Sequence, residues 1–229
     1  MPDPRSGPRL FGRRHGKALR QKARSLLTTL LPRLAILPPA EGERLDPAAL
    51  FPRPVRAVWL EIGFGAGEHL IWQAVHHPDV GLIGSEVFVN GVASLLGHCE
   101  RHAADNLRVF AEDARRLFPA LPDACLERVF VLFPDPWPKK RHAERRFISP
   151  DNLGQLARLM GAGGELRIAT DDETYKEWAA SQMARQTDFL AIAGDPTAKT
   201  DDWPETRYEA KAKKQGRQPV YLRYVRRPR

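Results

Sequence analysis

The chain has 229 residues, a length that is enough to bury a core without disulfides. Its composition, 42% hydrophobic and 28% charged residues, is typical of a soluble globular protein. Its two cysteines exclude a disulfide framework and favour a reducing, cytoplasmic setting, and no apolar run approaches the roughly 18 residues of a membrane-spanning helix. The formal net charge of +8 is concentrated at the two ends of the chain, a distribution that favours a polyanionic partner over solubilising tails.

The N-terminal part of the sequence changes character twice. Residues 1–16 hold three prolines, three glycines and four arginines with little to bury, and they predict a flexible basic arm. Residues 17–31 place Leu and Ala at helical spacing and predict one amphipathic helix. Prolines between 38 and 54 predict a linker. We therefore expect an arm and helix at 1–45 and a main domain at 46–229.

The two ends share a strong basic excess. Residues 1–33 carry nine Lys/Arg against one Asp, and residues 207–229 carry nine Lys/Arg against one Glu, while acidic residues are in excess between them. The apolar stretch 25–37 follows a long basic leader and is broken by Pro32 and Arg33, which makes it a poor signal peptide. We expect neither a membrane protein nor a secreted one.

The main domain alternates short apolar runs with longer segments of helical spacing. Continuous apolar strands spaced by helices predict a Rossmann-like doubly wound α/β sheet, mostly parallel and covered on both faces. The predicted strands are 57–62, 80–87, 106–111, 128–133 and 164–170, and the predicted helices 69–77, 90–103 and 152–160. The last run, 219–225, alternates better and predicts an antiparallel edge strand. Ligands of such sheets bind at the carboxyl ends of the strands.

An acid stands at the carboxyl end of each of the first three predicted strands. Glu61 precedes a turn with glycines at 63, 65 and 67, whose spacing matches neither a dinucleotide site nor a phosphate-binding loop. Glu86 lies about 20 residues further on, where an acid accepts both ribose hydroxyls of a nucleoside, and Asp113 follows the third strand. Singly, each acid could be a helix cap or a solvated residue. Together they resemble the pattern of class I S-adenosylmethionine-dependent methyltransferases.

The loop after the fourth strand is the most specific feature of the sequence. Prolines hold residues 134–138 extended, Asp135 follows the strand directly, and Trp137 offers a flat face for a base. Five Lys/Arg within 139–146 are placed to grip phosphates.

This loop, FPDPWPKKRH, resembles the signature of bacterial tRNA (guanine-N7-)-methyltransferases. The resemblance spans about residues 55–225 and includes LEIGFGAG, GSEV, NLRVFAEDA, ATDDE and TRYE. It implies a cytoplasmic enzyme, monomeric or homodimeric and without metal, that uses S-adenosylmethionine to methylate N7 of a guanosine in the variable loop of tRNA.

The resemblance also implies roles for individual residues. Cofactor contacts are implied for Glu61, Gly63, Glu86, Asp113 and Asp135, and Asp135 is also implied to be the catalytic residue. Contacts with the substrate or RNA are implied for Lys139, Arg141, Arg145, Arg146, Asp171, Thr206, Arg207, Tyr208 and Glu209. At positions 207 and 208, Arg-Tyr replaces the more usual Lys-Phe.

Methylation of guanine N7 requires few catalytic groups from the protein. N7 is an unprotonated acceptor, so its lone pair needs no general base, and a carboxylate such as Asp135, helped by Asp171, would stabilise the positive charge that moves onto the purine. Two alternatives stay open: a methyltransferase for an exocyclic amino group, whose loop usually has consecutive prolines, and a non-catalytic RNA-binding relative. One predicted helical face carries His98, Cys99 and His102, which could suggest a metal site. Because no fourth ligand is evident, we interpret this face as solvated surface.

Overall fold

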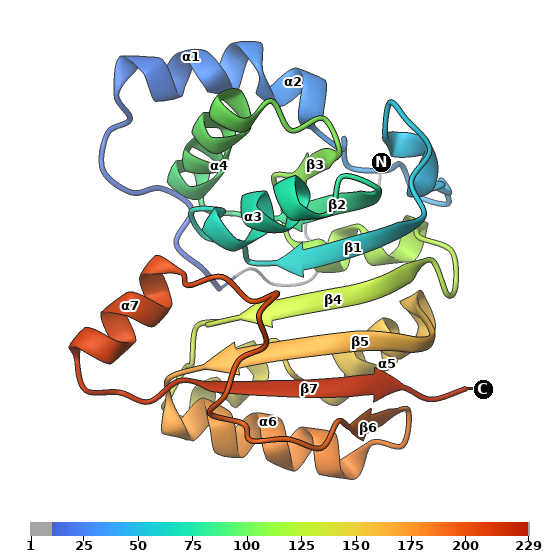
Figure 1. Ribbon diagram of the computed structural model, residues 1–229, viewed down its shortest axis with the longest axis vertical. Helices are drawn as coiled ribbons and strands as arrows, with labels where there is room; N and C mark the ends of the chain where they lie inside the picture. Colours follow the sequence, from blue (N-terminus) through green and yellow to red (C-terminus); the bar gives the residue numbers. More distant parts are fainter. Residues whose placement is uncertain (1–10, 229) are drawn as a thin grey trace.

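The computed structural model describes residues 11–228, and seven strands form one sheet in it (Figure 1). The strands are β1 (Ala57–Ile62), β2 (Val80–Ser85), β3 (Leu107–Phe110), β4 (Leu126–Leu132), β5 (Met160–Thr170), β6 (Phe189–Ala191) and β7 (Val220–Arg226). The α-helices are α1 (Gln21–Thr29), α2 (Leu31–Leu34), α3 (Glu68–His76), α4 (Val89–His102), α5 (Pro150–Leu159), α6 (Glu173–Arg185) and α7 (Arg207–Lys214).

The sheet has the doubly wound topology that the sequence predicts. Its strand order is β3-β2-β1-β4-β5-β7-β6, and β1 to β5 pair in parallel. The last strand, β7, is antiparallel to β5, as predicted. It is not itself the edge, because the short strand β6 pairs with its other side and was not predicted. The carboxyl ends of β1 to β5 therefore share one edge of the sheet.

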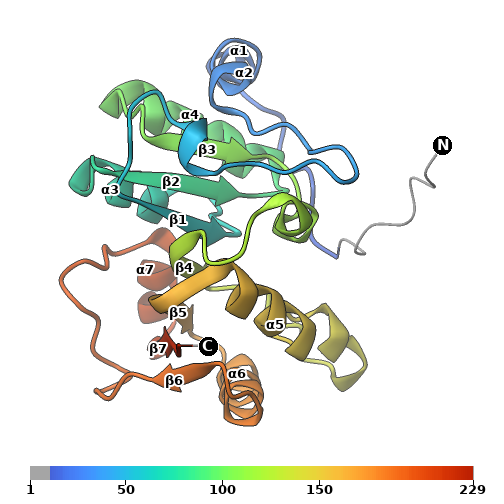
Figure 2. The ribbon, with the colours of Figure 1, turned by 90° about the vertical axis from the view of Figure 1, so that its right-hand side faces the viewer.

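Two helical layers cover the sheet, and Figure 2 shows them on opposite faces. Side chains of successive strand residues point to opposite faces, so a buried strand supplies both layers. On β1, Leu60 packs in the apolar cluster that includes α5 and α6, whereas Trp59 packs in the cluster that includes α3 and α4. Both side chains are almost fully buried.

The predicted N-terminal helix forms as two short helices. Arg20 precedes α1 in extended backbone, and Pro32 lies in the first turn of α2, where its missing N–H costs nothing. Buried Leu26 joins the apolar cluster of α3 and α4. After α2, Ala35 pairs in parallel with Val109, so the chain runs along the outer edge of β3.

Candidate active site

A cavity of about 410 Å³ opens at the carboxyl edge of the sheet, where the sequence analysis places the ligand. Its walls come from the ends of β1, β2 and β4, the turn after β3, the start of α7 and the segment around residue 12. Of the predicted site residues it brings together Glu61, Gly63, Glu86, Asp113, Asp135, Arg145, Thr206 and Tyr208.

The glycine turn lets a ligand approach the backbone closely. Gly63 has φ 71°, a left-handed conformation that L side chains rarely adopt, and an added Cβ there would meet no atom within 4 Å. At Gly65 (φ 58°) a Cβ would lie 2.9 Å from the Tyr208 ring. The turn thus presents bare backbone to the cavity at Gly63, while Gly65 packs closely against Tyr208 of α7.

Glu61 lies at the base of the cavity with one carboxylate oxygen engaged. Its side chain is buried, and Oε2 lies 2.7 Å from His69 Nδ1. Among residues 11–228, its Oε1 accepts no hydrogen bond. A carboxylate oxygen that lines a cavity and has no donor in the protein is suited to a cationic or amino-bearing ligand.

Glu86 serves the protein backbone as well as the cavity. Its Oε2 accepts the Gly65 N–H at 2.8 Å, and Oε1 accepts the N–H groups of Val87 and Phe88 at 2.8 and 2.9 Å. A carboxylate has about four acceptor sites, so roughly one, on Oε2, stays available for a ligand hydroxyl. Desolvation raises the pKa of Glu86 in spite of these hydrogen bonds, which act to lower it.

Asp113 is held by its own turn. Its carboxylate accepts the backbone N–H of Arg115 at 3.0 Å and pairs with the Arg115 guanidinium at 2.6 Å. The residue thus caps the short helical turn 114–116 while its side chain stays at the cavity wall.

Asp135 lies between two strained aromatic residues. Phe133 (φ 49°) and Trp137 (φ 43°) both adopt the left-handed region, which is costly for bulky residues and clusters at functional sites. Among the described residues, Asp135 accepts no hydrogen bond, and desolvation at the cavity wall raises the pKa of its carboxyl group. The loop therefore presents an unpaired carboxylate at the end of β4.

A segment that the sequence analysis assigned to the basic arm reaches the cavity. Phe11 packs edge-on against Trp137, with ring centroids 6.5 Å apart. The Arg145 guanidinium lies over both rings, 4.8 Å from the centroid of Phe11 and 5.0 Å from that of Trp137. The segment is tied down further along, where Asn90 accepts the Gly16 N–H at 2.7 Å. A lone aromatic in a polar arm is too weak a sequence signal to predict this contact.

Arg146 differs from the RNA contact that the resemblance implies. Its side chain is buried, donates to the carbonyl of Trp137 at 2.9 Å and to that of Pro136 at 3.1 Å, and lies over the Trp178 ring. In this structure Arg146 holds the loop from inside. Lys139 and Arg141 are exposed on the same loop, outside the cavity wall.

The remaining predicted residues lie beside the cavity, already paired. Asp171 pairs with Arg217 at 3.0 Å, and Arg207 pairs with Glu68. Glu209 is buried between two lysines, Lys199 at 3.0 Å and Lys213 at 2.7 Å, and these ion pairs lower its pKa although burial alone would raise it. Its backbone N–H is capped by the Thr206 hydroxyl at 3.2 Å. These contacts join Asp171 to the segment between α7 and β7, and Glu209 to Lys199 in the segment before α7.

Residues 11–228 hold neither a candidate metal site nor a candidate membrane-spanning helix. No three His, Cys, Asp or Glu side chains lie together as metal ligands would, and within the described chain no helix is long and apolar enough to cross a bilayer. The face that carries His98 and His102 includes Cys99, whose burial raises its pKa to about 12.

Comparison with known proteins identifies methyltransferases as relatives of this chain, in agreement with the geometry of the cavity. The family described as "Putative methyltransferase" matches residues 55–222. A tRNA (guanine-N(7)-)-methyltransferase of Paramagnetospirillum magneticum is 57% identical over 97% of this chain and 94% of its own. The enzyme of the same name from Rhodospirillum rubrum is 54% identical over 100% of this chain and 92% of its own. A 16S rRNA (adenine(1408)-N(1))-methyltransferase from Catenulisporales acidiphilia, 16% identical with a TM-score of 0.54 over 84% of this chain and 98% of its own, shares the fold.

Proposed function

The chain belongs to the family of bacterial tRNA (guanine-N(7)-)-methyltransferases, and from this premise we propose how its cavity carries out the reaction. The enzyme transfers the methyl group of S-adenosylmethionine to N7 of a guanine in tRNA. We place the cofactor in the cavity against Glu61, Gly63, Glu86 and Asp113, and the target base beside Asp135. The target is a guanosine of the variable loop, as the sequence resemblance implies, and the enzyme acts in the cytoplasm as a monomer or homodimer.

The single observation that carries this assignment is the set of acceptors on the cavity wall. Glu61 offers a free carboxylate oxygen for an ammonium group, and Glu86 offers an acceptor for a ribose hydroxyl. The open backbone at Gly63 leaves room for an amino acid tail. No phosphate-binding loop is present in the sequence, so the site fits an adenosine without phosphates.

The protein's own part in the reaction is positioning and electrostatics. When bound, S-adenosylmethionine supplies a methyl group activated by its sulfonium. Asp135 faces the place where the purine gains positive charge, and its carboxylate stabilises that charge without accepting a proton. Trp137 and Tyr208 flank the opening and offer faces on which a base pulled from its stack can rest.

The reaction product tests this function directly. The purified protein should label unmodified tRNA from methyl-labelled S-adenosylmethionine, and nucleoside mass spectrometry should identify cationic N7-methylguanosine. A neutral methylamino base would support the exocyclic alternative. Binding of cofactor without any product would support a non-catalytic RNA-binding protein.

We also propose that the chain before residue 46 serves RNA binding, with Arg5 and Arg9 contacting phosphates. Deleting residues 2–10 should weaken tRNA binding and leave cofactor affinity unchanged. The cut stops before Phe11 because Phe11 to Arg13 line the cavity. Each lost phosphate contact should reduce the slope of log affinity against log salt by about 0.7–0.9, so two contacts are measurable by titration at several salt concentrations.

The matched control changes charge alone in the full-length chain. Replacing Arg5 and Arg9 by Gln should reduce the salt slope as the deletion does. An unchanged affinity and slope in both variants would show that this segment does not bind tRNA. The exposed Lys139 and Arg141 would then supply the contacts at the loop.

A further inference from the structure

We propose that His69 and Gln73 are positioning residues, which orient the Glu61 carboxylate for the cofactor and join it to the segment 202–209 at the cavity rim. The inference rests on the proposed function, in which Glu61 contacts S-adenosylmethionine. Neither residue belongs to the motifs that the sequence analysis singled out. Both lie on α3, one turn apart, and both are buried, with 2% and 0% of their surface exposed.

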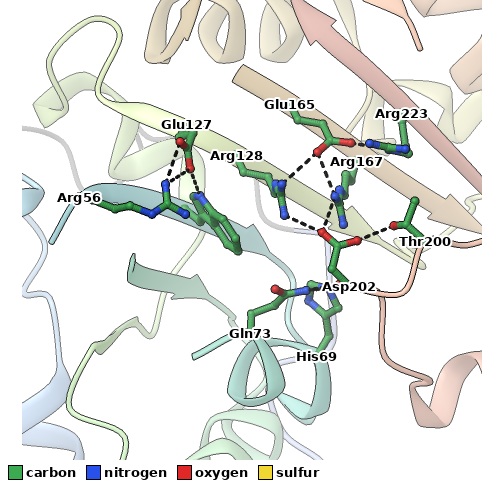
Figure 3. A network of polar contacts seen from close by, with 11 residues as sticks. Arg56, His69, Gln73, Glu127, Arg128, Glu165, Arg167, Thr200, Asp202 and Arg223 are labelled. Atoms are coloured by element: carbon green, nitrogen blue, oxygen red, sulfur yellow. Dashed lines mark hydrogen bonds and ion pairs between the residues drawn. The ribbon is translucent and has the colours of Figure 1, made fainter. Parts of the chain in front are cut away.

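A continuous series of hydrogen bonds links the Glu61 carboxylate to the backbone of Asp202. Glu61 Oε2 lies 2.7 Å from His69 Nδ1, and His69 Nε2 lies 3.1 Å from Gln73 Nε2. Gln73 Nε2 in turn donates to the backbone carbonyl of Asp202 at 2.7 Å. Figure 3 shows His69 and Gln73 beside Asp202. This series of hydrogen bonds thus connects the end of β1 with the segment before α7.

The direction of each bond follows from the Asp202 carbonyl, which can only accept. The Gln73 amide must turn its NH₂ group toward this carbonyl, and its second hydrogen then points at His69 Nε2. His69 is therefore unprotonated at Nε2, carries its proton on Nδ1, and donates it to Glu61. Within the described chain, the Gln73 carbonyl oxygen has no partner. A buried acceptor without a donor is costly, yet flipping the amide would set two oxygens against each other.

Asp202, at the far end of this series of hydrogen bonds, is held firmly in place. The Asp202 carboxylate pairs with Arg167 at 2.8 Å and with Arg128 at 3.1 Å, as Figure 3 shows. Burial alone would raise the pKa of Asp202, but the hydrogen bond from Arg167 holds it well below its usual range. Trp203, 2% exposed, packs edge-on against Tyr221 at 5.0 Å. Thr206 and Tyr208, which line the cavity, follow a few residues later.

The test separates binding from chemistry. His69→Phe keeps the ring that packs on Phe130 but removes both nitrogens, and it should raise the Kd and KM for S-adenosylmethionine about tenfold, the effect of one charge-assisted hydrogen bond. Its kcat at saturating cofactor should stay near the wild-type value. His69→Asn places an amide donor near the position of Nδ1 and should restore most of the affinity. Gln73→Met should raise the KM for cofactor and also the KM for tRNA, because the backbone carbonyl of Asp202 loses its hydrogen-bond donor.

Two reference variants make the outcome decisive. Gln182→Met replaces a buried glutamine of α6 away from the cavity and should change neither KM. Glu61→Gln reports on the proposed function: if it leaves cofactor affinity unchanged, the assignment of Glu61 itself fails. If Glu61→Gln weakens binding while His69→Phe and Gln73→Met bind normally, only this inference is overturned. Equal losses in His69→Phe and His69→Asn would indicate lost packing and would also overturn it. Should His69→Phe fail to fold, unchanged KM values in Gln73→Met decide against the proposal.

Discussion

Replacing Asp135 by asparagine should slow methyl transfer by about 10²–10³-fold, the usual effect of removing one preorganised electrostatic partner, while cofactor affinity falls much less. Asparagine keeps the size of the side chain and removes only its charge. The Asp135 carboxylate has no hydrogen-bond partner among residues 11–228, so little of its charge is spent on the fold. The strained backbone at Phe133 and Trp137 holds it at the end of β4. We therefore expect it to act on the charge that appears on the purine.

Single-turnover rates at saturating cofactor and tRNA measure this effect, and titration calorimetry measures cofactor binding separately. The rate of the wild-type enzyme should rise with pH as Asp135 ionises, at a higher pH than for an ordinary aspartate because desolvation raises its pKa. This limb should vanish in the variant. Asp105→Asn, an exposed aspartate that pairs with Arg53 away from the cavity, is the matched control. A near-normal single-turnover rate in Asp135→Asn would refute the assignment.

Replacing Glu86 by alanine should weaken cofactor binding by about 10–100-fold, the effect of losing one hydrogen bond to a charged group. The same change removes the acceptor of three backbone N–H groups, so it should also lower the free energy of unfolding by roughly 1–3 kcal/mol. tRNA affinity should change little, because Glu86 lies inside the cavity and is nearly buried.

Glu86→Gln separates the two effects. Its one carbonyl oxygen can still accept hydrogen bonds, so both cofactor affinity and stability should fall between those of the wild type and Glu86→Ala. Calorimetry gives the Kd, and thermal unfolding with and without S-adenosylmethionine gives the stability. If Glu86→Ala binds cofactor as the wild type does, Glu86 only holds the backbone of the turn and the start of α4.

The strands were the most predictable part of the fold because their boundaries are marked in the sequence. β1 has the predicted bounds, since Arg56 and Gly63 limit a run that is apolar except for Glu61. β5 begins four residues earlier than predicted, at Met160, because α5 leads directly into it and its pairing with β4 continues across a register shift, within which Gly163 adopts φ 81°. Neighbouring strands supply the hydrogen bonds there, which local sequence does not reveal.

α7 was missed although a signal was present. Its sequence RYEAKAKK buries only Glu209 and Ala212, so it shows almost no apolar periodicity. Thr206 followed three residues later by Glu209 is, however, the pattern of a helix N-terminus, and the Thr206 hydroxyl does cap the Glu209 N–H. The resemblance implies only substrate contact for this motif and does not point to its structural role.

Within the site, the position of the strand-end residues follows from the order of the strands, whereas the contacts of Arg146 and His69 depend on how distant segments fold together. Glu61, Glu86 and Asp135 line the cavity because parallel strands end at one edge. The inward turn of Arg146 depends on the path of the loop, which returns its guanidinium to the carbonyl of Trp137. His69 gains its importance only from the approach of the segment around Asp202, distant in sequence.

The segment after α2 has a consequence for the behaviour of the protein at high concentration. An uncovered edge strand offers free N–H and C=O groups to which other chains can add, and it is a common origin of aggregation. Here the chain's own Ala35 and Ile36 lie along β3, where the Ile36 N–H donates to Val109 at 2.8 Å. The opposite edge is the three-residue strand β6, too short to serve as a template. Neither edge of the sheet therefore offers a long uncovered strand to which a second copy of the chain could add.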